Sequence, residues 1–149
     1  MVRIYGITTP PKGGATGVET QYKVYGTSNG SGFTFLSKNG VSTETLSNSI
    51  VLTPSKSSYI TYKIIASPTL VPQECASWNL MLTVAKDATP GSVNIIDVSP
   101  VNATSHTNLS GLSIELSENK TLGSISIKCT GVSGYNGIDW VASIYITEV

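Results

Sequence analysis

Charged side chains are scarce in this chain. Lys, Arg, Asp and Glu make up 12% of its 149 residues, which is about half of their usual share in soluble domains. Nine basic residues balance nine acidic ones, and neither sign gathers into a block. Nucleic-acid binding needs clustered Lys and Arg to neutralise phosphates, so the composition argues against that function.

Long apolar runs are also missing. Hydrophobic residues form 40% of the chain but are spread along it, whereas a membrane-spanning helix needs about 20 apolar residues in succession. The first residues, MVRIYGITTPPKGG, lack the apolar stretch of a secretory signal. We therefore expect no membrane insertion and a protein assembled in the cytoplasm as part of a virion. The alternative is an extracellular or cell-surface protein whose leader has been removed.

Metal-ligating and catalytic residue types are few. The two cysteines, Cys75 and Cys129, are 54 positions apart and match no metal-binding spacing. Two interpretations remain open for them, a pair of buried thiols or a disulfide. The single histidine, His106, stands in a polar stretch with no carboxylate near it in sequence, so we interpret it as a solvated loop residue. No phosphate-binding glycine motif occurs. We predict no catalytic residues, no metal and no cofactor, and hence a protein that is not an enzyme.

Hydroxyl side chains take the place of charge. Ser and Thr supply about one residue in four, and they suit the outward positions of β-strands. Low charge also favours packing against other protein surfaces, because few charges lose their hydration at the contact.

Strand-like segments separated by Gly, Pro, Asn and Ser recur along the chain, which is typical of a sandwich or barrel. Apolar residues alternate with polar ones within several segments, and no helical periodicity extends beyond a turn. The predicted strands are 2–7, 20–26, 32–37, 49–54, 58–66, 78–85, 92–99, 112–117, 123–130 and 139–149. The sequence thus predicts one all-β domain over 1–149, an antiparallel β-sandwich of nine or ten strands without substantial helix.

Loops are predicted at several places. SNGSG at 28–32 is expected to join its two neighbouring strands as a hairpin, and 100–111 is expected to be an exposed loop. TPPKGG at 9–14 is stiff and then flexible, so residues 1–14 are predicted to form an extended arm. Such an arm can add to the sheet edge of a neighbour. Its possible assembly contacts are Val2, Ile4, Tyr5 and Ile7, which equally fit an ordinary first strand.

Two further patterns concern sugars. Four Asn-x-Ser/Thr sequons, at Asn29, Asn102, Asn108 and Asn119, lie in or beside predicted loops and can accept glycans if the protein is secreted by a glycosylating host. Exposed aromatic rings stack on sugars. Tyr135, in the Gly-rich stretch GVSGYNG, is the best single residue for such binding.

The segment WNLMLTVAKDATPGSVNIIDVS, about 22 residues long, resembles the strand, turn and strand of immunoglobulin-like modules in bacterial, archaeal and phage surface proteins. The resemblance implies a scaffold for adhesion, capsid decoration or fibre building. About fifty residues follow the hairpin, more than such modules often have, so a jelly roll stays open beside the immunoglobulin-like topology.

We therefore expect a non-enzymatic structural protein of a virion, such as a capsid decoration, coat or tail component, or a subunit of a surface assembly. Its partners would be copies of itself or a capsid or appendage lattice protein. The alternatives are a secreted, pilus-like filament subunit that uses strand addition, and a carbohydrate-binding module.

Overall fold

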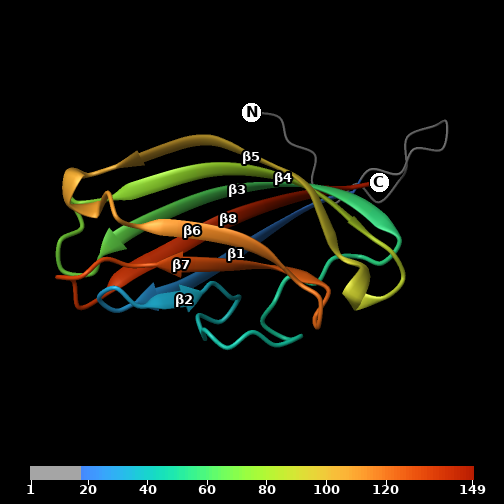
Figure 1. Cartoon of the computed structure of the whole chain (residues 1–149), viewed down its shortest axis with the longest axis horizontal. Helices are drawn as coiled ribbons and strands as arrows, with labels where there is room; N and C mark the ends of the chain where they lie inside the picture. The colour runs from blue at the N-terminus through green and yellow to red at the C-terminus, as the bar shows by residue number, and fades with distance from the viewer. Residues whose placement is uncertain (1–17) are drawn as a thin grey trace.

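The computed structural model describes residues 18–149, which form an antiparallel β-sandwich (Figure 1). Two three-residue 3-10 helices, η1 (Pro90–Ser92) and η2 (Thr107–Leu109), are the only helical segments in that range, and no helix there is long and apolar enough to cross a membrane. The strands are β1 (Val18–Ser28), β2 (Phe33–Phe35), β3 (Lys56–Pro68), β4 (Ala76–Lys86), β5 (Asn94–Ser105), β6 (Ser113–Asn119), β7 (Ser124–Thr130) and β8 (Ile138–Glu148).

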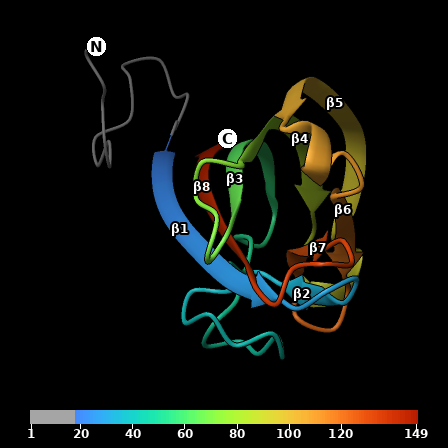
Figure 2. The same cartoon turned by 90° about the vertical axis from the view of Figure 1, so that its left-hand side faces the viewer.

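The strands form two sheets that face each other across the core (Figure 2). The larger sheet has five strands in the order β1-β8-β3-β4-β5, and the smaller has three in the order β2-β7-β6. Seen from the end, the larger sheet curls around the smaller one. The first strand lies beside the last, and the second beside the last but one. This nesting agrees with a jelly-roll wrap, although β4 and β5 stay in the same sheet as β3.

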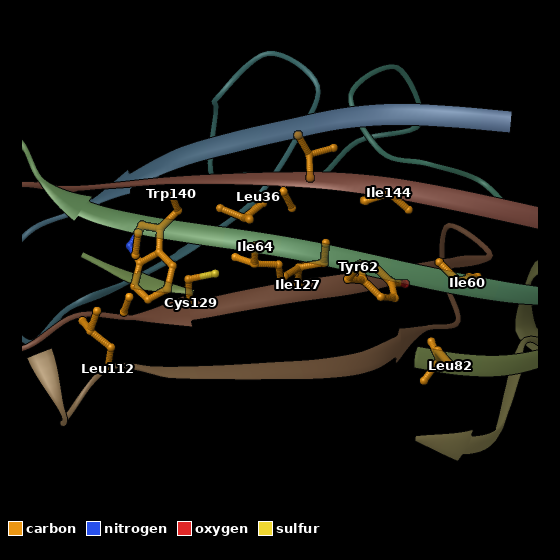
Figure 3. Packing of buried hydrophobic residues seen from close by; sticks show 14 of the residues in the cluster. Leu36, Ile60, Tyr62, Ile64, Leu82, Leu112, Ile127, Cys129, Trp140 and Ile144 are labelled. Atoms are coloured by element: carbon orange, nitrogen blue, oxygen red, sulfur yellow. The ribbon is translucent and has the colours of Figure 1, made fainter. Parts of the chain in front are cut away.

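Alternation along the long strands places one apolar face inside. In β3, Ile60, Tyr62 and Ile64 are buried, whereas Tyr59 and Ile65 point outward. The same period of two sends the side chains of β8 inward at even positions and outward at odd ones. Figure 3 shows the inward set meeting Ile127 and Cys129 of β7 across the interior. The alternation predicted from the sequence is therefore confirmed.

The two tryptophans meet near one end of the core. Trp140 of β8 is fully buried, and its ring stacks on Trp78 of β4 with centroids 5.5 Å apart. The indole nitrogen of Trp140 donates a hydrogen bond of 2.9 Å to the hydroxyl of Ser28. This bond ties the end of β1 to the core and satisfies a polar group that burial would otherwise leave unpaired.

The connection at 28–32 is not the expected hairpin. The short β2 pairs with β7 in the smaller sheet, and only a single bridge between Tyr25 and Ser37 links it back to β1. The turn therefore carries the chain from one sheet to the other. The expectation failed because a turn motif fixes the local reversal but not the sheet that the following strand joins.

The predicted strand at 49–54 is reduced to one bridge, between Val51 and Ser124. Side-chain hydrogen bonds organise the preceding loop, where the Asn48 amide donates to Thr43 O and its oxygen accepts from Thr45 N–H. Leu52 is buried in the core without any ladder on either side. The apolar pattern was therefore correct about burial but wrong about the strand.

The exposed loop predicted over 100–111 is also wrong. β5 continues to Ser105, pairs with β4 along its length, and leads directly into η2. Ser77 and Thr104 face each other across this ladder, with their hydroxyl oxygens 2.9 Å apart. Polar residues form the strand here because β5 is an edge strand with an exposed outer side.

Candidate functional site

The outward side of the larger sheet is a broad surface with few charges. The sheet register aligns its side chains in rows across the strands. One row runs Tyr25, Val141, Ile65, Ser77; the next Lys23, Ser143, Lys63, Asn79; then Gln21, Tyr145, Thr61, Met81, Ser99; and last Glu19, Thr147, Tyr59, Thr83, Asp97. We call these four rows the outer face.

Apolar side chains on the outer face are strongly exposed. Tyr25 is 44% accessible to solvent, Tyr59 46% and Ile65 50%. Two rows carry no charge, one carries two lysines, and one carries an acidic residue at each end. The lysine row and the row with the two acidic residues therefore lie at different positions along the strands. A second copy in the opposite orientation can place its acidic row against the lysine row of the first copy.

One long edge of the larger sheet is open beside the outer face. On the side of β1 away from β8, the described residues show main-chain pairing only between Tyr25 and Ser37. Because main-chain groups alternate sides along a strand, those of Glu19, Gln21 and Lys23 point away from β8. Within residues 18–149 no strand pairs with them, so this edge is a template for strand addition.

The loops at one end of the sandwich meet around Glu74. Connections β1–β2, β3–β4, β5–β6 and β7–β8 all lie at this end, on the left of Figure 1. Glu74 accepts a hydrogen bond of 2.5 Å from the Tyr135 hydroxyl and one of 3.1 Å from the Asn108 amide. Three loops are thereby joined through one carboxylate. We call Glu74, Tyr135 and Asn108 the loop clasp.

Hydrogen bonds within the loop clasp shift the pKa values of Glu74 and Tyr135. The bond from Tyr135 is the main reason that the pKa of Glu74 is lowered from its usual 4.5, with smaller contributions from Asn108 and the nearby His106. The same bond raises the pKa of Tyr135. His106 was expected to be a solvated residue without a carboxylate neighbour. It is exposed, and its Nδ1 accepts from Asn108 N–H, but the fold brings it close to Glu74.

Stability at acid pH should reflect the loop clasp. Because the folded pKa of Glu74 is lowered, its stabilising contribution is complete above the usual carboxyl range and is lost as the pH falls through the folded pKa. The melting temperature of Glu74→Gln should therefore fall less on acidification than that of the unaltered chain. Glu115→Gln, which removes an exposed carboxylate of β6, is the matched control. Equal acid dependence of Glu74→Gln and the unaltered chain would contradict the role of the clasp.

The cysteines are two free thiols in different surroundings. Cys129 is fully buried among core residues, as the buried-thiol interpretation expected, and burial raises its pKa. Cys75 is exposed just before β4, so the prediction of two buried thiols is wrong for this residue. The disulfide alternative is not formed in this structure. The inward direction of Cys129 and the surface position of Cys75 explain why the thiols stay separate.

The sequons lie in different settings. Asn29 is exposed in the β1–β2 turn, and Asn108 belongs to the loop clasp. Asn119 ends β6, where its amide donates to Glu44 at 3.3 Å. Asn102 lies within β5, so its expected loop position is wrong. The predicted assembly contacts Val2, Ile4, Tyr5 and Ile7, and the arm over 1–14, lie outside the described residues.

The interior cavity between the sheets is small. It has a volume of about 20 Å³ and is lined by core residues together with Glu44 and Tyr62. A space of that size holds about one water molecule. Among the described residues, no three His, Cys, Asp or Glu side chains gather as a metal site would require.

Comparisons with known proteins add little. No protein-family model matches the chain, and no curated protein matches its sequence. Among solved structures, the tailspike protein of Acinetobacter baumannii phage AM24 aligns with a TM-score of 0.36 and 8% identity, over 87% of this chain and 26% of the tailspike chain. The chain thus spans about a quarter of that protein's length. The function must therefore be argued from the chain's own surface.

Proposed function

We propose that the chain is a non-enzymatic structural module of a virion or surface assembly, and that it works by packing its outer face against a second copy or a lattice protein. The observation that supports this proposal is the low-charge outer face, which spans the larger sheet and exposes Tyr25, Tyr59 and Ile65. Exposed aromatic and apolar side chains set among few charges are typical of protein interfaces.

Charge on the outer face favours a copy of the same chain. Lys23 and Lys63 lie in one row, and Glu19 and Asp97 end another. A two-fold arrangement that stacks one face on the other brings lysines of one copy toward acids of its partner. Since the flanking rows carry no charge, little hydration is lost elsewhere in the contact.

Strand addition at β1 is the second way to assemble. The open main-chain groups of Glu19, Gln21 and Lys23 support it. An arm such as residues 2–7, or a partner's segment, would then extend the larger sheet. This is the mode of the filament-subunit alternative, and it buries main-chain groups rather than the outer face.

A single substitution separates these modes. Ile65→Asp places a carboxylate on the central strand β3, in an uncharged row of the outer face, and because Ile65 is half exposed we expect the fold to survive. Self-association should weaken at least roughly tenfold, since a charge would be buried without a partner. The measurement is native mass by light scattering, with the melting temperature to verify folding.

Leu46→Asp is the matched control, because Leu46 is an exposed apolar residue of the loop before β3 and lies outside the outer face. It should associate like the unaltered chain. If Ile65→Asp assembles as well as the control, the outer face is not the interface. Assembly that fails with Lys23→Pro but survives Lys23→Ala would assign the contact to the β1 edge, because only proline removes the main-chain donor.

A further inference from the structure

A small hollow lies beside the loop clasp, at the end of the sandwich. It has a volume of about 170 Å³, and one side is lined by Pro68 at the end of β3 and by Leu70 and Val71 of the β3–β4 loop. The β7–β8 loop lines the other with Gly134, Tyr135, Asn136 and Gly137. The hollow is smaller than the roughly 300–1,000 Å³ of a drug-sized pocket, so it suits a single ring.

Tyr135 is held in place from both ends. Its carbonyl oxygen accepts a hydrogen bond of 2.8 Å from Gly30 N–H, and its hydroxyl donates to Glu74. The opposite wall is tied to the same loop, because Thr69 N–H donates to Gly137 O at 3.0 Å. An aromatic ring fixed before binding loses little conformational freedom when a ligand arrives.

The lining combines the apolar side chains of Pro68, Leu70 and Val71 with the ring of Tyr135 and the amide of Asn136. Leu70 is 83% exposed beside the ring, and the clasp does not require this side chain. Asn136 is exposed on the other side. Next to Gly137, the Thr69 hydroxyl donates to Asp139 at 3.1 Å. An exposed amide beside apolar side chains can receive a ligand with an apolar face and hydroxyl edges.

The charge of this region selects against anions. Two carboxylates lie next to the segments that line the hollow, because Glu74 is hydrogen-bonded to Tyr135 and Asp139 to Thr69. No lysine or arginine is among the residues that line it. A phosphate, sulfate or carboxylate ligand would therefore be repelled, whereas a neutral ligand would not.

We propose that this hollow binds one ring of a neutral saccharide. The sugar's apolar face packs against Tyr135 and Leu70, and its hydroxyl groups exchange hydrogen bonds with the side-chain amide of Asn136. This site lies at the loop end, whereas the proposed assembly contact uses the outer face. A module can therefore pack in a lattice and still present the hollow to a glycan.

The test uses the full chain on an immobilised panel of neutral oligosaccharides built from glucose, galactose, mannose and N-acetylglucosamine. We expect at least one to bind, with the dissociation constant then measured by calorimetry. Tyr135→Ala should weaken binding roughly tenfold through loss of the ring contact. Leu70→Ser should also weaken it, and it leaves the clasp intact if Tyr135→Ala fails to fold.

Phe33→Ala is the matched control, since it removes an exposed aromatic residue of β2 that belongs neither to the outer face nor to the hollow, and it should bind like the unaltered chain. Failure of every neutral glycan to bind would overturn the proposal. Binding that survives both Tyr135→Ala and Leu70→Ser would overturn it as well. Either result leaves the assembly proposal untouched, because native mass does not depend on the hollow.

Discussion

Replacing Trp140 by alanine should lower the free energy of unfolding by about 3–5 kcal/mol. The ring is fully buried and stacks on Trp78, so its removal leaves a cavity between the sheets. It also removes the donor to Ser28, at the point where β1 ends. Urea unfolding followed by circular dichroism measures the change.

Ser28→Ala separates hydrogen bonding from packing. It keeps the tryptophan but leaves the buried indole N–H without its acceptor, so about 1–3 kcal/mol should be lost. If Ser28→Ala costs as much as Trp140→Ala, hydrogen bonding rather than ring packing dominates this end of the core. A loss below about 1 kcal/mol for Trp140→Ala would contradict the described burial.

Replacing Lys86 by methionine should also destabilise the fold, by about 1–3 kcal/mol. Lys86 ends β4 and is almost fully buried, and its ammonium donates to Leu52 O at 2.5 Å and to Gly123 O at 3.2 Å. Burial lowers its pKa, so the charge itself is unfavourable there. Methionine relieves that cost but leaves the carbonyls without this donor, and we expect the second effect to dominate.

Lys56→Met is the matched control for this substitution. Lys56 is the register partner of Lys86 on β3, is more exposed, and has no side-chain hydrogen bond among the described contacts. Its replacement should change the unfolding free energy by less than about 0.5 kcal/mol. Equal unfolding free energies for Lys86→Met and the unaltered chain would show that the hydrogen bonds of the Lys86 ammonium do not stabilise the fold.

The fold class could be predicted because side-chain alternation is a local property. Alternation of apolar and polar residues was predicted from spacing alone, and its apolar face, with Ile60, Tyr62 and Ile64 in β3, forms the core. Sheet membership is not local. The register of β2 against β7 depends on residues almost a hundred positions away, and no turn motif reports it.

The candidate sites were also only partly predictable from the sequence, because their residues are far apart along the chain. Tyr135 could be singled out from its Gly-rich surroundings, but its partner Glu74 is 61 positions away. The role of Lys86 could not be predicted from the sequence, because the carbonyls that bind it belong to segments 34 and 37 positions distant. Such sites exist only once the loops have been brought together, so sequence spacing could not reveal them.

The central claim, that the chain functions by packing with other protein surfaces, is tested most directly by its native mass. Light scattering over a concentration series, with and without reductant, is the measurement. We predict a dimer or larger assembly that does not depend on reductant, because the contact is made by the outer face and not by the exposed Cys75 thiol. A strict monomer at every concentration would contradict self-assembly. An assembly that dissociates in reductant would show that a disulfide through Cys75, and not the outer face, holds the copies together.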